Sequence, residues 1–178
     1  PDPSPLEPTA MSTKNQPDIR LAQKDDAPAL HAMLFQIAAA TGCEDKFKSS
    51  PDDLVRDGFG NALAFEAMIA TENSTPVALC LYFPSYSTFR GQAGLYIQDL
   101  YVAPSHRGAQ PGGSLARNLV QAVAKQAHAQ GKTYIRLSVD AQNIIGQRFY
   151  EKLGMRPADD EKIFILDGDA FTDLAQNK

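Results

Sequence analysis

The chain has 178 residues, with 17 lysines and arginines against 21 aspartates and glutamates, which gives a formal net charge of −4. Its length and its ordinary composition, 43% apolar and 21% charged, predict a soluble globular protein with one well-packed domain. The acidic balance, without clusters of Lys or Arg, argues against nucleic-acid binding. No apolar run approaches the ~20 residues of a membrane helix, so we expect no membrane partner.

Two cysteines, Cys43 and Cys80, are too few for a disulfide framework, and they lack the spacing of metal ligands. We therefore expect no metal site, two structural thiols and a cytoplasmic location. Residues 1–17 hold five of the twelve prolines and few large apolar side chains. They are interpreted as a flexible leader or a remnant of expression, with Met11 as a possible natural start.

In chain order, residues 19–22 have strand character, and Asp25 or Asp26 is predicted to start a helix that ends before Gly42. A single apolar stripe follows that helix: Leu30, Met33, Leu34 and Ile37. A second helix is expected to begin at Ser50-Pro51-Asp52-Asp53 and to stop at Gly58, because proline and carboxylates favour the first turn.

The middle of the chain predicts a hairpin of two strands, residues 64–71 and 77–86, joined by a turn over residues 72–76. A third strand is expected at residues 94–102, followed by a glycine-rich loop and a helix over residues 114–130. Further elements are predicted as follows: a strand at 134–139, a helix at 144–153 and a sheet-closing strand at 163–166. This order predicts an α/β (α+β) fold with a mixed sheet, in a single domain over residues 18–170 with a tail at 171–178.

The stretch of residues 100–115 runs from strand through loop to helix. An anion at the start of that helix would meet unpaired backbone N–H groups and the positive end of the helix dipole. Glycines allow a close backbone approach, and Arg107 adds a cation. Taken alone, this pattern is also compatible with a tight turn that binds nothing.

Read together with residues 143–155, which contain Asn143 and Tyr150, this stretch resembles the two signature segments of the GCN5-related N-acetyltransferase (GNAT) superfamily. The resemblance covers residues 19–156. Residues 57–60 and 96–102 are most similar to the diamine (spermidine/spermine-type) and thialysine acetyltransferases. It implies the GNAT fold: a central, twisted, mostly antiparallel sheet, splayed at the cofactor site, with helices on both faces.

The resemblance also implies acetyl-CoA as co-substrate. The strand would contribute Leu100, Tyr101 and Val102, and Asn143 would hold the same pantetheine arm from the opposite side. The pyrophosphate loop and helix start would contribute Arg107, Gly108, Ala109, Gln110, Gly112, Gly113 and Ser114. Gln110 replaces the middle glycine of the family motif, and Pro111 removes a backbone donor.

For catalysis, the resemblance identifies Tyr150 with the tyrosine that protonates the CoA thiolate, although an aromatic packed under the last helix would look the same. Gln98 stands where diamine acetyltransferases have a glutamate base, and an amide cannot take that proton. Asp99 is a candidate base or a structural hydrogen-bonding group. A water held by Gln98 and Tyr96 is a further alternative, and Glu66 is a weaker candidate.

The implied activity is transfer of the acetyl group of acetyl-CoA to a primary amine of a small molecule, such as a diamine, a polyamine or a lysine-like amino acid. Members resembling this group are commonly homodimers, and we expect one here. Two rival functions stay open. One is a protein N-terminal or lysine acetyltransferase, and the other is a non-catalytic acyl-CoA-binding module.

The distribution of charge fits this implied activity. Residues 100–139 contain five cations and no acid, which leaves 12 cations and 21 acids elsewhere, a balance of −9. We interpret this as a cationic CoA face beside an acidic amine face. Residues 44–57, with five acids and three cations, are either part of that acidic face or a solvated helix surface.

Overall fold

The structure is a computed structural model that describes residues 16–108 and 113–176. The chain divides into two compact units, residues 1–138 and residues 139–178, and each unit is described by itself. Residues 1–15 of the expected leader lie outside the described residues. The single domain expected over residues 18–170 stays a prediction.

Unit 1 contains one five-stranded sheet in the order β1-β2-β3-β4-β5. Its strands are β1 (Asp18–Leu21), β2 (Glu66–Glu72), β3 (Thr75–Ser87), β4 (Gln92–Val102) and β5 (Ile135–Leu137). Neighbouring strands are antiparallel except β4 and β5, which are parallel. The mixed, mostly antiparallel sheet that the sequence predicts is therefore confirmed.

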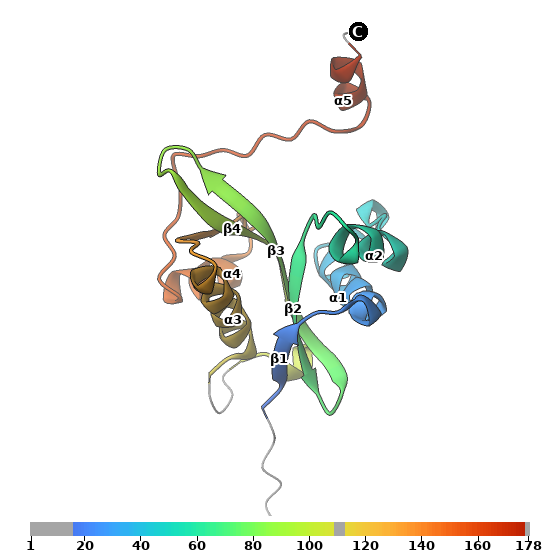
Figure 1. Ribbon diagram of the computed structural model, residues 1–178, viewed down its shortest axis with the longest axis vertical. Helices are drawn as coiled ribbons and strands as arrows, with labels where there is room; N and C mark the ends of the chain where they lie inside the picture. The colour runs from blue at the N-terminus through green and yellow to red at the C-terminus, as the bar shows by residue number, and fades with distance from the viewer. Residues whose placement is uncertain (1–15, 109–112, 177–178) are drawn as a thin grey trace, which may run out of the picture. The chain divides into compact units, whose positions relative to one another are not determined.

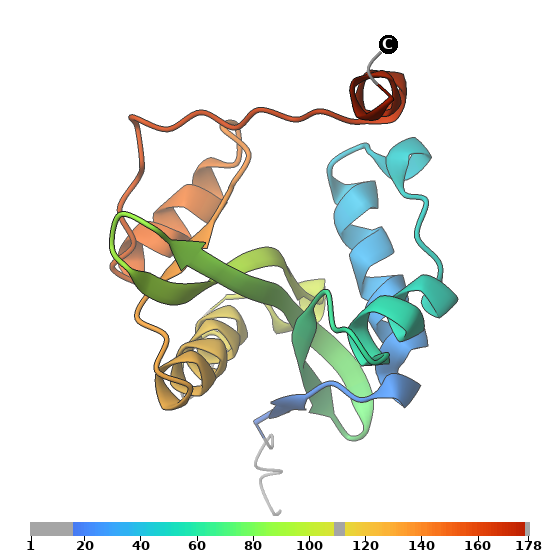
Figure 2. The ribbon, with the colours of Figure 1, turned by 45° about the horizontal axis from the view of Figure 1, so that its top comes forward.

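Helices cover both faces of this sheet. Within unit 1, α1 (Ala27–Ala40) and α2 (Pro51–Phe59) lie on one side of the strands, and α3 (Leu115–Ala129) lies on the other (Figures 1 and 2). Among the residues that the structure describes, three short 3₁₀ helices connect the larger elements: η1 (Lys24–Asp26), η2 (Glu44–Lys46) and η3 (Pro104–His106). This two-sided arrangement agrees with the predicted layers.

The core on the α1–α2 side is built from alternate residues of the central strands. Leu30 of α1, Ile69 of β2 and Leu79 of β3 are fully buried in one apolar cluster. Because successive side chains of a strand point to opposite faces, Cys80 and Tyr82 lie on the α3 side. The Tyr82 hydroxyl donates a hydrogen bond to Oε1 of Gln126 on α3, 3.0 Å away, which ties that helix to the sheet.

The β2–β3 hairpin is tighter than the sequence suggests. The turn contains only Asn73 and Ser74, with φ of 49° and 64°, because Glu72 and Thr75 already pair with each other. Two left-handed residues in succession match the right-handed twist of the flanking strands. The predicted turn over residues 72–76 was therefore too long.

Unit 2 contains α4 (Ile144–Lys152), as predicted, and α5 (Gly168–Ala175), which the sequence did not predict and in which the expected tail begins. The expected strand at residues 163–166 is wrong. These residues lie outside any strand, and their apolar side chains are exposed by 50% to 91%. Within the described residues 139–176, unit 2 contains no strand that could pair with them.

Candidate functional site

β4 carries a bulge at Gln98. Leu81 of β3 pairs with Asp99, whereas the next residue of β3, Tyr82, pairs with Ile97, so Gln98 has no partner on β3. The Gln98 side chain is exposed. A bulge bends the strand and re-aims its side chains. As a result, Asp99 shares the sheet face of Leu81, the face that α1 and α2 cover.

The opposite edge of β4 is open beyond the bulge. β4 pairs with β5 only over residues 95–97, so residues 98–102 have no strand on that side within the described part of unit 1. An open strand edge presents backbone N–H and C=O groups that can bind an extended ligand. Leu100, Tyr101 and Val102, which the family resemblance assigns to the cofactor, lie on this unpaired segment.

The end of β4 is fixed by two hydrogen bonds. The Val102 carbonyl accepts a bond from Nε of Arg107 (2.8 Å), and the Ala103 N–H donates to the Val77 carbonyl (2.8 Å). Val102 is buried, and Tyr101 packs against the core on the α1–α2 side. The Val102 carbonyl is therefore already occupied by Arg107.

The connection from β4 to α3 begins with η3, which is followed by Arg107 and Gly108. Gly108 and Gly113 have φ of +91° and +99°, a region that strongly favours glycine. Three residues predicted to bind the cofactor, Ala109, Gln110 and Gly112, lie outside the described residues, as does Pro111.

The start of α3 has the features of an anion site. Oγ of Ser114 accepts a hydrogen bond from the Arg117 N–H (3.3 Å), which caps the helix. The first-turn amides have no partner within the helix, and they lie at the positive end of its dipole. Arg107 is exposed, and its described contact uses only Nε, so the other guanidinium donors can bind an anion. This donor set fits a phosphate group.

Asp99 is a half-buried carboxyl for which the described residues provide no hydrogen bond. Burial raises its pKa above the ordinary aspartate value. A carboxylate with a raised pKa holds a proton more readily near neutral pH, as a general base requires. Of the groups predicted to act as the base, Asp99 therefore has the most suitable surroundings.

An aromatic pair lies next to Asp99 on the same sheet face. Phe83 of β3 pairs in register with Tyr96 of β4, and their rings stack with centroids 5.1 Å apart and planes inclined by 16°. The Tyr96 hydroxyl donates to Oγ of Ser138 over 2.7 Å, which fixes the ring. Aromatic faces attract cations.

The sequence did not identify Phe83 as part of a site. It lies in the strand predicted over residues 77–86, and its alternation with Leu79 and Leu81 places it on the face of Asp99. Only the β3–β4 register, which the bulge shifts, brings it opposite Tyr96. Phe89 lies fully exposed between β3 and β4.

Glu66 lies on a different side of the sheet. Its Oε1 accepts a hydrogen bond from Nε2 of Gln126 (3.3 Å), and Oε1 of Gln126 in turn accepts from the Tyr82 hydroxyl. Gln126 is twelve residues beyond Ser114, so roughly 18 Å of helix separates it from the start of α3. This contact gives Glu66 a structural role, on the face opposite Asp99.

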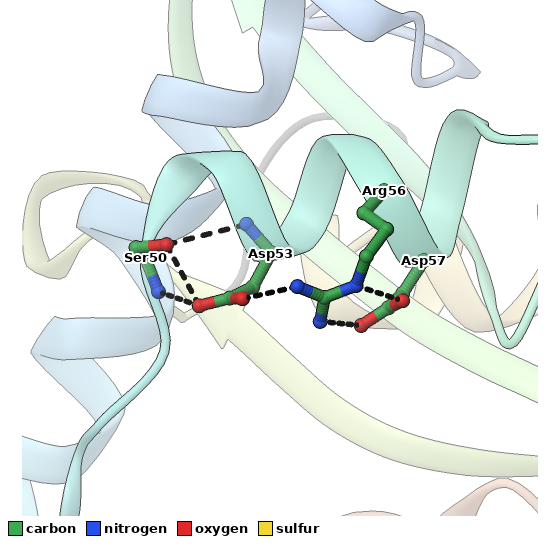
Figure 3. A network of polar contacts seen from close by, with 4 residues as sticks. All are labelled: Ser50, Asp53, Arg56 and Asp57. Carbon is green, nitrogen blue, oxygen red and sulfur yellow. Dashed lines mark hydrogen bonds and ion pairs between the residues drawn. The ribbon is translucent and has the colours of Figure 1, made fainter.

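The acids of α2 are largely engaged in local contacts (Figure 3). Ser50 and Asp53 form a capping box, and Arg56 bridges Asp53 (2.7 Å) and Asp57 (2.6 Å). Hydrogen bonds from Ser50, then from Arg56, lower the pKa of Asp53 to about 2. Arg56 therefore pairs with two of the five acids in residues 44–57 and offsets one of their two negative charges.

The buried thiol of Cys80 does not act as a nucleophile, and the described residues form no metal site. Burial, with a smaller contribution from Asp99, raises the pKa of Cys80 to about 12, so its thiol stays protonated. The described residues contain no group of three or more His, Cys, Asp or Glu side chains that could hold a metal ion. Among the same residues, no helix combines the length and the apolar character needed to cross a membrane.

Unit 2 contains the other two predicted site residues. Asn143 caps α4, because its Oδ1 accepts a hydrogen bond from the Gly146 N–H over 2.8 Å. Tyr150 is a half-buried residue of α4 whose ring meets that of Phe149 edge to face, with centroids 5.1 Å apart. Asn143 and Tyr150 are thus placed within unit 2, and Asp99 and Arg107 within unit 1.

Comparison with known proteins identifies the family. The sequence model of a family described as "Acetyltransferase (GNAT) family" matches residues 29–155, more than half of the chain. A thialysine N-epsilon-acetyltransferase of Bos taurus is 29% identical over 168 residues, covering 88% of this chain and 96% of the bovine protein. An L-ornithine N5-acetyltransferase of Arabidopsis thaliana is 32% identical over 91 residues, 51% of this chain and 38% of the plant protein.

Solved structures share the fold at low sequence identity. An integron cassette protein from the mobile metagenome of V. cholerae has a TM-score of 0.75 at 17% identity and covers 91% of this chain and 99% of its own. A ribosomal-protein-alanine N-acetyltransferase from Brucella melitensis has a TM-score of 0.66 at 21% identity, covering 86% of this chain and all of the Brucella chain. These similarities concern the fold alone.

Proposed function

The chain belongs to the GNAT family of acetyltransferases, and we propose that it transfers the acetyl group of acetyl-CoA to a primary amine of a small molecule. The observation that carries this proposal is Asp99, a half-buried carboxyl of raised pKa beside the Phe83–Tyr96 pair. It supplies both a proton acceptor and a surface for a cationic amine.

Acetyl-CoA supplies an activated thioester when bound. Arg107, the capped start of α3 at Ser114, and the glycines Gly108 and Gly113 would hold its pyrophosphate. The open edge of residues 100–102 would hold its pantetheine arm. Ala109, Gln110 and Gly112 are further proposed contacts that rest on the family motif alone. Calorimetry that detects no acetyl-CoA binding at millimolar ligand would reject this part of the proposal.

Asp99 is the proposed general base. An alkyl ammonium must lose a proton before its nitrogen can attack, and Asp99 would accept that proton directly or through a water. Gln98 has no ionisable group, so its proposed role is to hold such a water beside Tyr96. This arrangement would compensate for the absence of a glutamate at Gln98.

Tyr150 is the proposed general acid. Its phenol, with a reference pKa near 10, carries a proton at neutral pH and would donate it to the departing sulfur. Asn143 is proposed as a contact for the pantetheine arm through its amide Nδ2, because its Oδ1 is occupied by the Gly146 N–H. Both assignments rest on the positions of these residues in the family motif.

The proposed acceptor is a cationic primary amine, such as a diamine, a polyamine or a lysine-like amino acid. Two observations support this class. The stacked aromatic pair and Asp99 would attract a positive charge, and the two relatives described above are named for thialysine and L-ornithine. Arg56 pairs with Asp53 and Asp57, so α2 would contribute less negative charge to the proposed acidic amine face than the acids of residues 44–57 alone suggest.

The experiment is a panel of amines assayed with acetyl-CoA by release of the CoA thiol, with mass spectrometry of the product. The panel contains diamines, polyamines, lysine and its analogues, neutral primary amines and short peptides. We expect the highest kcat/KM with cationic free amines. Preference for peptides would favour the protein acetyltransferase, and tight CoA binding without thiol release would favour the binding module.

A homodimer in the cytoplasm completes the proposal. The apolar side chains exposed along residues 163–166 and on α5, at Phe171 and Leu174, support burial against a second copy of the chain. The two free cysteines support a reducing compartment. Sedimentation velocity at micromolar concentration should give a dimer, and a monomer across that range would contradict it.

A further inference from the structure

His106 and Glu72 connect two loops that lie far apart in the sequence. Nε2 of His106, at the end of η3, lies 3.0 Å from Oε2 of Glu72, the last residue of β2. The two residues are 34 positions apart, and β3 runs between their strands. Their side chains are only 19% and 32% exposed. The contact therefore fastens the start of the β4–α3 connection to the β2–β3 hairpin.

Both ring nitrogens of His106 are engaged. Nδ1 lies 2.9 Å from Oγ of Ser105, and Nε2 faces the Glu72 carboxylate. An ionised carboxylate only accepts hydrogen bonds, so Nε2 must carry the proton of a neutral ring, and Nδ1 then accepts from the Ser105 hydroxyl. Two partners on opposite sides of the ring fix its orientation.

The next residue along the chain is Arg107. Backbone bonds from His106 N–H to the Ala103 carbonyl (2.8 Å) and from Arg107 N–H to the Pro104 carbonyl (3.3 Å) close the 3₁₀ turn. The Arg107 side chain then folds back onto Val102 through Nε. The guanidinium thus takes its position from the turn that His106 anchors.

We propose that the His106–Glu72 pair is a positioning device that holds Arg107 in place for the pyrophosphate of acetyl-CoA. This inference rests on the proposed function, since it concerns the same cofactor. Neither residue acts on the reacting atoms. The pair fixes the turn before the ligand arrives, so less conformational freedom is lost on binding. The pair therefore affects the affinity for the cofactor and not the rate of the chemical step.

The test measures CoA affinity by calorimetry for the full chain and five variants. His106→Ala and Glu72→Ala should each weaken CoA binding about tenfold, and the double variant should be no weaker than either single one, because one contact is lost in all three. His106→Gln keeps a donor at the same distance along the side chain and should restore most of the affinity. His128→Ala, an exposed histidine of α3, is the matched control and should bind as the parent does.

A second measurement separates positioning from general damage. S-acetylpantetheine carries the thioester but lacks the pyrophosphate, so kcat/KM with this donor should be equal in the parent and in His106→Ala. With acetyl-CoA, the same variant should show a raised KM at unchanged kcat. Equal losses with both donors, or CoA affinity within twofold of the parent in both alanine variants, would overturn the proposal.

A third measurement needs no cofactor. Nitrogen-15 NMR of the His106 ring should show mainly the Nε2-protonated tautomer in the parent. In Glu72→Ala, the ring should no longer prefer this tautomer over the Nδ1-protonated one. A parent chain that shows this tautomer but binds no CoA would refute the proposed function, and this assignment with it. CoA binding that none of the variants alters would refute this assignment alone.

Discussion

Asp99 of β4 stands directly opposite Leu81 of β3, on the sheet face that α1 and α2 cover, because the bulge at Gln98 shifts the register by one residue. Replacing Asp99 by Asn should lower kcat about 100-fold, since an amide cannot accept a proton. The base must be ionised, so activity should fall as pH decreases through its raised pKa. A pH profile of kcat/KM should therefore show an acidic limb above the ordinary aspartate range, absent in the variant.

The matched control for this prediction is Glu66→Gln, which changes a carboxylate on the opposite face. That variant should keep the kcat and the pH profile of the parent, because Glu66 contacts Gln126 and lies far from the start of α3. An unchanged acidic limb in Asp99→Asn, or its loss in Glu66→Gln, would contradict the assignment of the base.

Asp99→Asn should also raise thermal stability at neutral pH. The folded-state pKa of Asp99 lies above its unfolded value, so the folded state binds more protons between the two and stability declines as pH rises through that range. Removing the charge removes this penalty. Calorimetric Tm should be higher for the variant at pH 7, and the difference should shrink below the ordinary aspartate pKa.

Tyr150→Phe should reduce turnover with little effect on the cofactor. The phenol is the proposed proton donor, and its loss should lower kcat about 100-fold while the Kd for acetyl-CoA stays within twofold. Phe149→Leu, which changes the neighbouring ring on the same helix, serves as the control for packing. Full activity of Tyr150→Phe would end the assignment.

Asn143 combines a known contact with a proposed one. Asn143→Ala removes the cap on α4 and should destabilise the protein by about 1 kcal/mol. Asn143→Asp keeps an oxygen for the Gly146 N–H, so thermal stability should return. If the amide also donates to the pantetheine arm, acetyl-CoA affinity should stay reduced in this variant. Full recovery of both properties would limit Asn143 to its role as a cap.

Gly94 leaves room for an aromatic ring. A Cβ at this position would lie 2.5 Å from the ring of Tyr134, whose hydroxyl is 3.1 Å from Oγ of Ser85. Gly94→Ala should therefore displace the ring and destabilise the protein by about 1 to 3 kcal/mol. Denaturant unfolding should show a larger loss in the free energy of unfolding for Gly94→Ala than for Ala93→Gly, a control at the exposed neighbouring position on β4.

The capping box of α2 predicts a pH-dependent contribution to stability. Ser50→Ala should lower Tm, with a loss of about 1 kcal/mol, because Oγ of Ser50 caps the helix and also contacts Asp53. The pKa of Asp53 is about 2, below its unfolded value, so its contribution is complete above pH 4 and is lost as pH falls through 2. The difference in Tm between parent and variant should therefore become smaller over that range. It should not vanish, because the bond from the Asp53 N–H to Oγ of Ser50 does not depend on the charge of Asp53.

Local chemistry explains which elements the sequence predicted correctly. Ser50 and Pro51 start α2, and Ser114 caps α3, because capping needs only residues that are neighbours in the chain. The turn between β2 and β3 was predicted too long, since Asn73 and Ser74 adopt left-handed conformations only when Glu72 and Thr75 pair across the hairpin.

The predicted strand at residues 163–166 shows the limit of this reasoning. Its alternating apolar residues favour an extended chain, and the chain is indeed outside any helix there. A strand also requires a partner that supplies hydrogen bonds, and the sequence does not indicate which partner that is. Composition therefore predicted the character of the segment but not its pairing.

The sequence by itself determined the family and the order of strands and helices from β1 to α4, because these depend on contiguous residue patterns. The tertiary structure alone decided that Asp99 is half-buried beside Phe83 and Tyr96, and that Glu66 lies on the other face. It also decided that His106, half-buried at the end of η3, meets Glu72. Those relationships depend on strand register and burial, which arise only when distant segments pack together.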